Sequence, residues 1–120
     1  MLPSLHTSSA TNPPSELSVD ELAARLASTA PPLVAEILGP QNFASGHLPG
    51  ALNLPLEGFA ERAQQALPSK TQEIVVYCAS STCQNSDIAA RKLQSLGYQN
   101  VRVFRGGKAA WRDAGHPLAT

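Results

Sequence analysis

The chain has 120 residues, of which 42% are hydrophobic, enough for one domain with a substantial core. Nine basic and nine acidic residues give a net charge of zero, so overall charge favours neither nucleic acid nor membrane as a partner. No apolar run approaches the ~18 residues of a membrane span, and the first residues lack the apolar region of a signal peptide. We therefore expect a cytoplasmic protein whose two cysteines are reduced.

The charges are unevenly distributed along the chain. Residues 1–86 hold seven acidic and three basic side chains, a net charge of −4, whereas residues 87–120 hold two acidic and six basic side chains, a net charge of +4. A site bordered by the last third of the chain would favour anions. The alternative is that the asymmetry has no role, since small domains commonly show one.

The first half of the chain predicts two helices and two strands. Residues 1–15 are rich in Ser, Thr and Pro without periodicity, which predicts a disordered tail before a domain at 16–120. A capping box at Ser18 and Glu21 begins a helix. "LVAEIL" (33–38) predicts a buried strand, residues 40–44 one helical turn, and residues 51–53 a brief strand. The second helix is predicted by an apolar stripe at Leu56, Phe59, Ala60, Ala63 and Leu67.

The second half alternates strand and helix more regularly. "EIVVYC" (73–78) is short, β-branched and apolar on both faces, which is typical of a parallel sheet. Ala89, Leu93 and Leu96 mark a helix that ends at Gly97. "NVRVF" (100–104) predicts a strand and "KAAWRDAG" (108–115) a last short helix. The alternation predicts an α/β fold with a parallel sheet covered on both faces.

Cys78 stands where a parallel sheet places its ligands. It ends the "EIVVYC" strand, and ligands of open α/β sheets bind at the carboxyl ends of the strands. Amides at the start of the next helix would stabilise a thiolate there and make it nucleophilic. The following loop would supply those amides from Ala79, Ser80, Ser81, Thr82, Cys83 and Gln84. The alternative is a buried cysteine that only fills the end of the strand.

Four stretches resemble the rhodanese family of sulfurtransferases over residues 15–119: "GHLPGALNLPL" (46–56), "IVVYC" (74–78), "AARKLQSLGYQNVRVFRGGKAAW" (89–111) and "AGHPL" (114–118). The resemblance implies a rhodanese-like α/β fold, a central five-stranded parallel sheet flanked by helices on both faces. It also implies that Cys78 accepts sulfane sulfur from a small anionic donor, thiosulfate or a persulfide, and that a thiol or cyanide removes it. No cofactor is implied.

The chain departs from the family pattern at two places. Where many members read Asp-Val-Arg, this chain reads Glu36, Ile37 and Leu38, which predicts the loss of a structural ion pair. The active loop has no basic residue, and Ala89 lies eleven residues after Cys78, about two more than in many members. Loop amides, helped by Arg105, would then have to attract the anion.

Two other functions remain open on this fold. Phosphatases and arsenate reductases built on this fold have a Cys-x5-Arg pattern, in which the arginine neutralises the phosphate or arsenate. Gln84 occupies that arginine position here. A non-enzymatic module would instead bind a partner or sense oxidants through Cys78 and Cys83. Cys83 is a candidate resolving thiol that forms a disulfide with Cys78 and releases sulfide; otherwise it is a small residue near a helix start. Two thiols without a suitably spaced histidine argue against a metal site.

The remaining distinctive residues have mainly structural predictions. His47 should hydrogen-bond a turn, Trp111 should pack the last helix on the sheet, and His116 should be solvated. Gly106 and Gly107 should let the backbone pass close to the active loop, or else form a simple turn. Lys108 is predicted to be a surface base or to steer anions.

Overall fold

The computed structural model describes residues 14–120, so most of the predicted tail, residues 1–13, lies outside the described residues. The elements follow in this order: β1 (Ser15–Glu16), α2 (Val19–Leu26), β2 (Leu33–Glu36), α3 (Pro40–Ser45), β3 (Leu52–Asn53), α4 (Phe59–Ala66), β4 (Ile74–Tyr77), α5 (Asn85–Ser95), β5 (Val101–Phe104) and α6 (Gly107–Asp113). None of these helices is long and apolar enough to cross a bilayer.

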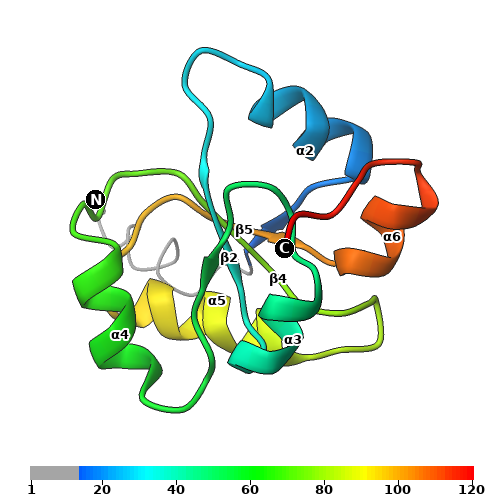
Figure 1. Ribbon diagram of the computed structural model, residues 1–120. Coiled ribbons are helices and arrows are strands. Elements are labelled where there is room, and N and C mark those ends of the chain that lie inside the picture. The colour runs from blue at the N-terminus through cyan, green and yellow to red at the C-terminus, as the bar shows by residue number, and fades with distance from the viewer. Residues whose placement is uncertain (1–13) are drawn as a thin grey trace.

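The strands form one parallel sheet in the order β1-β5-β4-β2-β3 (Figure 1). The central strand β4 pairs along its whole length with β2 and β5, so that Tyr77 lies beside both Glu36 and Phe104. All three chain segments therefore leave the sheet at the same edge. The predicted five-stranded parallel α/β fold is confirmed.

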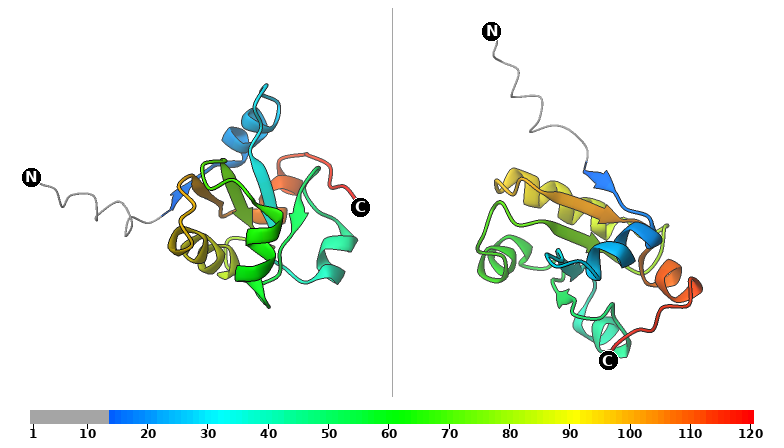
Figure 2. Two further views of the ribbon diagram at one scale, coloured as in Figure 1. Left: turned by 90° about the vertical axis from the view of Figure 1, so that its left-hand side faces the viewer. Right: turned by 90° about the horizontal axis from the view of Figure 1, so that it is seen from above.

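The edge strand β1 was not predicted from the residue pattern. It pairs with β5 through Ser15 and Glu16 (Figure 2), and the amide of Leu17 continues the pairing to the carbonyl of Val103 at 3.0 Å. Both strand residues are exposed, so they carry no apolar alternation that would mark a strand. Ser15, which the sequence assigned to the tail, thus belongs to the sheet.

The first helix begins as its capping box predicts. The hydroxyl oxygen of Ser18 accepts a hydrogen bond from the amide of Glu21 at 3.1 Å, and the Glu21 carboxylate accepts one from the amide of Ser18 at 2.8 Å. These bonds satisfy two amides that a helix start leaves without intrahelical partners. They also hold the pKa of Glu21 below its ordinary value.

Helices cover both faces of the sheet, because successive side chains of a strand point to opposite sides. In β4, Ile74 and Val76 pack under α4 and α5, whereas Val75 and Tyr77 pack under α2 and α6 (Figure 1). Trp111 joins the second cluster and meets the ring of Phe104 edge-on at 6.5 Å between centroids. The predicted packing role of Trp111 is confirmed.

A buried ion pair lies at Glu36, the first residue of the stretch that departs from the family pattern. Glu36, at the end of β2, is fully buried, and its carboxylate lies 3.1 Å from the ammonium group of Lys108. The hydroxyl of Tyr77 donates a second bond to Glu36 at 2.8 Å, and burial raises the pKa of Tyr77 far above its ordinary value, so this hydroxyl stays protonated.

Lys108 is therefore not a surface base. Its side chain is only 12% exposed, and its ammonium group also donates to the carbonyls of Asn42 and Gly46 at 2.8 and 2.7 Å. The prediction of a surface lysine is wrong, whereas the loss of an ion pair to an arginine at position 38 stays a prediction. The countercharge of Glu36 comes from α6, far along the chain, and not from a neighbouring arginine.

We expect Lys108→Met to lower the free energy of unfolding by about 3 kcal/mol, because it leaves the Glu36 carboxylate buried without a countercharge. Denaturant unfolding followed by circular dichroism measures this loss. Arg112→Met, on an exposed position of the same helix, should cost less than about 0.5 kcal/mol. The double variant Glu36→Gln/Lys108→Met should recover part of the loss; no recovery would mean that the charge pair is not the cause.

Candidate functional site

Cys78 follows β4 directly and is buried, with 1% of its surface exposed. The backbone of α6 holds the start of the next loop from one side. The amide of Lys108 donates to the carbonyl of Cys78 at 3.1 Å, and that of Ala109 donates to the carbonyl of Ala79 at 3.0 Å. Cys78 thus lies at the carboxyl edge of the sheet, as the sequence predicted.

Gly107 makes this close approach possible. Its φ is +63°, and a Cβ atom there would lie 2.3 Å from the carbonyl oxygen of Cys78 and 2.9 Å from the backbone of Ala79 and Ser80. No other residue has both the conformational freedom and the small size that this contact demands. The prediction that the glycine pair lets the backbone pass the active loop is confirmed at Gly107.

The other end of the loop is fixed to β2 and turned back on itself. The side-chain amide of Asn85, the first residue of α5, donates to the carbonyl of Ile37 at 3.1 Å. Within the loop, the amide of Cys83 donates to the carbonyl of Ser80 at 3.1 Å. This turn carries Cys83 back toward Cys78 and uses one of the amides that the sequence assigned to an anion cradle.

The two cysteines are joined in a disulfide, with their Cα atoms 6.3 Å apart. This separation meets the condition of about 7 Å for a bridge. The structure therefore describes the oxidised form, whereas the sequence led us to expect reduced thiols. The Cys-x4-Cys spacing places both sulfurs in one turn between β4 and α5.

Ser86 is a site residue that sequence reasoning missed. It lies in the first turn of α5, is buried, and its hydroxyl oxygen is 3.8 Å from the sulfur of Cys78. In the reduced protein this hydroxyl can donate a hydrogen bond to a Cys78 thiolate. Its position could have indicated this role, because it is a small polar residue in the first turn of the helix that follows a candidate nucleophile.

Arg105, the predicted anion-steering residue, is already paired with two carboxylates. Its guanidinium binds Asp87 through two bonds, at 2.5 and 2.9 Å, and Glu16 at 3.0 Å. The bonds to Asp87, supported by Glu16, raise the pKa of Arg105 above its ordinary value. The arginine joins β5, α5 and β1, and its charge is largely balanced before any ligand arrives.

A cleft of about 470 Å³ opens over Cys83 and is lined by Ser81, Thr82, Cys83, Gln84, Asp87, Ile88, Arg91 and Arg105. Arg91 is exposed and forms no ion pair with any residue of the described chain, 14–120. Sequence reasoning missed Arg91. Its spacing from Gln84, Asp87 and Ile88 is that of one helical face, which could have placed it beside the loop.

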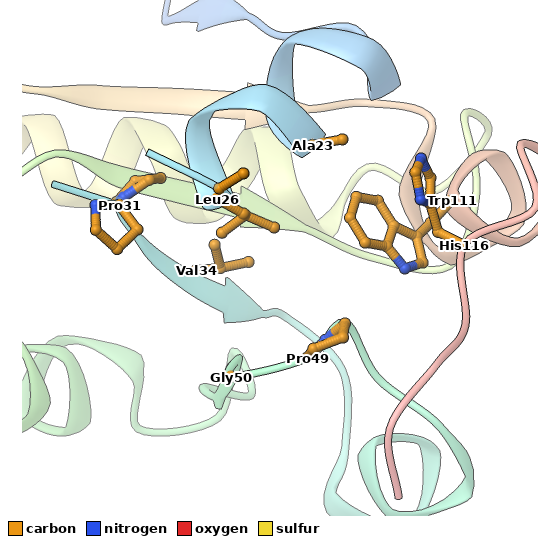
Figure 3. A pocket seen from close by; sticks show the side chains of 10 residues that line it. Ala23, Leu26, Pro31, Val34, Pro49, Gly50, Trp111 and His116 are labelled. Atoms are coloured by element: carbon orange, nitrogen blue, oxygen red, sulfur yellow. The ribbon is translucent and has the colours of Figure 1, made fainter. Parts of the chain in front are cut away.

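A second cleft, of about 530 Å³, lies on the face covered by α2 and α6 (Figure 3). Its lining is mainly apolar and includes Leu26, Val34 and Trp111 but no cysteine. His116 borders it and lies against Trp111, with 4.3 Å between ring centroids and 30° between ring planes, so His116 is not simply solvated. The structural role predicted for His47 is confirmed: its Nδ1 lies 2.8 Å from the carbonyl oxygen of Phe43.

Comparison with known proteins identifies the fold and the family. The family model described as "Rhodanese-like domain" matches residues 18–114. The chain belongs to the rhodanese-like domain family. Its similarity to a sulfurtransferase of Allochromatium vinosum is 35% identity over 103 residues, which cover 86% of this chain and 92% of that protein.

One further relative and one solved structure are similar to this chain. The rhodanese-like domain is 33% identical over 69 residues to the thiosulfate sulfurtransferase PspE of Escherichia coli, covering 58% of this chain and 64% of PspE. The crystal structure of the BH2092 protein from Bacillus halodurans superposes with a TM-score of 0.80 at 21% identity, covering 97% of this chain and 84% of that one. The latter likeness concerns the fold alone.

We expect Gly107→Ala to destabilise this rhodanese-like domain by about 3 kcal/mol or more, because the added methyl group collides with the backbone of the cysteine loop. Gly97→Ala is the matched control: its φ is also positive, at +96°, but nothing lies within 4 Å of the added atom. The control should lose only about 1–2 kcal/mol. Equal losses in thermal or denaturant unfolding would contradict a role for the close approach.

Proposed function

We propose that the protein is a sulfurtransferase that carries sulfane sulfur as a persulfide on Cys78. The observation that carries the proposal is the position of Cys78, buried at the carboxyl end of β4 beside the first turn of α5, in a chain of the rhodanese-like family. Named relatives are a sulfurtransferase and a thiosulfate sulfurtransferase. They support thiosulfate, or another small anionic sulfane donor, as the first substrate.

The first half-reaction loads the enzyme. The thiolate of Cys78 attacks the outer sulfur of thiosulfate, the bond between the two donor sulfurs breaks, and sulfite leaves with its electron pair. The product on the enzyme is the persulfide Cys78–S–S⁻. The hydroxyl of Ser86, the amino end of α5 and the remaining free amides of residues 79–84 stabilise the negative charge.

The second half-reaction returns the thiolate. A nucleophilic acceptor, cyanide or a thiol, attacks the outer persulfide sulfur and takes it away, so that cyanide yields thiocyanate. The first half-reaction requires Cys78 as a thiolate and the second requires it as a persulfide, so neither can run while Cys78 is bonded to Cys83. The disulfide with Cys83 is therefore inactive in transfer, and a thiol must reduce it before the first turnover.

One other function has a specific observation in its favour. The Cys78–Cys83 bond would suit a non-enzymatic module that senses oxidants. Phosphate chemistry has less support, because Gln84 offers no countercharge at the arginine position and Arg105 is occupied by carboxylates. Hydrolysis of a phosphate ester by the purified protein would reverse this order.

We expect the reduced protein to release one sulfite per chain on mixing with thiosulfate and to form thiocyanate when cyanide is present. Cys78→Ser should abolish both products, because a serine hydroxyl is not acidic enough to replace the thiolate. Sulfite and thiocyanate are measured colorimetrically. Undiminished sulfite release by Cys78→Ser would contradict the role of Cys78. No gain of sulfur in the intact mass with any sulfane donor, together with a peroxide-formed disulfide, would establish the sensor instead.

We expect Arg91→Gln to raise the KM for thiosulfate about fivefold with little change in kcat, because the cleft loses its unpaired cation; this corresponds to about 1 kcal/mol. The difference should shrink at high ionic strength, since salt screens the attraction. Lys92→Gln removes a charge from the next, exposed position, which does not line the cleft, and should leave KM unchanged. Equal effects of both variants would show that only overall charge matters.

A further inference from the structure

We infer that Cys83 resolves the Cys78 persulfide, so that the protein can release the transferred sulfur as sulfide and end in the disulfide state. This makes it a dithiol-dependent thiosulfate reductase in addition to a sulfurtransferase. The inference rests on the proposed function, because Cys83 has nothing to resolve unless Cys78 first becomes a persulfide.

The reach of Cys83 is the first support. The turn closed by the hydrogen bond from Cys83 to Ser80 brings the second cysteine over the first, and the two sulfurs are bonded in the structure. Both residues lie in a loop held at both ends, by α6 at Cys78 and by Asn85 at the start of α5. The Cys83 thiol is therefore an intramolecular nucleophile at high effective concentration beside the persulfide.

The different exposure of the two cysteines gives them different roles. Cys78 is 1% exposed and does not line the cleft, whereas Cys83 is half-buried and does. In the bonded state Cys83 thus stands between solvent and Cys78. A thiol arriving through the cleft meets the sulfur of Cys83 first, and attack there expels Cys78 as a thiolate beside Ser86.

The resolving step balances without another reactant. The sulfur of Cys83 attacks the sulfur of Cys78 that is bonded to its side chain, a new bond joins the two cysteines, and the bond to the outer sulfur breaks. The proton of the Cys83 thiol goes to the outer sulfur, which leaves as HS⁻. The two cysteine sulfurs are oxidised to a disulfide, while the sulfane sulfur is reduced to sulfide.

A dithiol reductant closes the cycle. Its thiolate attacks Cys83, forms a mixed disulfide and frees Cys78; its second thiol then releases Cys83 and leaves the reductant oxidised. Over one cycle thiosulfate and the dithiol become sulfite, sulfide and the oxidised dithiol. An external acceptor competes with Cys83 for the same persulfide, so acceptor concentration decides whether sulfur is transferred or released.

The test follows one turnover of reduced protein from which the reductant has been removed. On addition of thiosulfate without cyanide, the wild-type chain should release one sulfite and one sulfide and lose about 2 Da in intact mass. Cys83→Ser should release sulfite but no sulfide and gain about 32 Da, which later addition of cyanide removes. Sulfite, sulfide and mass are measured on the same samples.

The matched control adds a second thiol at a position far from Cys78. Ser69 precedes β4, and its hydroxyl lies beside that of Thr71. The carbonyl of Thr71 accepts a hydrogen bond from Asn100, which directly precedes β5. Ser69 therefore lies at the amino ends of these parallel strands, whereas Cys78 lies at their carboxyl ends. Cys83→Ser/Ser69→Cys should behave as Cys83→Ser alone. Sulfide release by this double variant would show that any thiol suffices and would overturn the role of Cys83.

The remaining outcomes separate this inference from the proposed function. If the wild-type chain releases sulfite but keeps the added 32 Da and yields no sulfide, Cys83 is not a resolving thiol and the sulfurtransferase proposal stands. If neither the wild-type chain nor Cys83→Ser releases sulfite, the proposed function fails and the resolving role fails with it.

Discussion

Lys108 connects the last helix, α6, to the buried Glu36 and to the cysteine loop. Its ammonium group neutralises the buried carboxylate of Glu36 and binds two carbonyls near α3, while its backbone amide holds the carbonyl of Cys78. A buried carboxylate without such a partner would cost several kcal/mol. The same contacts bring Gly107 against the cysteine loop, so one residue both neutralises the buried carboxylate and helps to hold the loop.

The cysteine loop lies between two helices that contact different parts of it. The backbone of α6 binds the carbonyls of Cys78 and Ala79, and the first turn of α5 supplies Ser86 to the sulfur. The two arginines near the loop also differ in their partners. Arg105 is used to join β1, β5 and α5, which leaves Arg91 as the cation of the cleft that has no ion-pair partner among residues 14–120. The framework thus uses Arg105 and leaves Arg91 unpaired at the cleft.

Much of the fold could be predicted because its signals are local. The capping box at Ser18 and the apolar strand ending at Cys78 both depend on neighbouring residues, and both are found where expected. The edge strand β1 could not be predicted in this way, because its two exposed residues gain their structure only by pairing with β5. Arg91 could not be assigned to the site from the loop sequence, because it lies within α5 and reaches the cleft only through the helix geometry.

The sequence by itself determined the order of strands and helices after β1, the family, and the place of Cys78 at the end of a central strand. Apolar periodicity and turn residues specify these features within short windows of chain. Only the tertiary structure decided that Glu36 finds its countercharge in Lys108, that Arg105 is occupied, and that Cys83 covers Cys78. Those outcomes depend on distances between segments that meet only when the sheet has formed, and no local pattern encodes such distances.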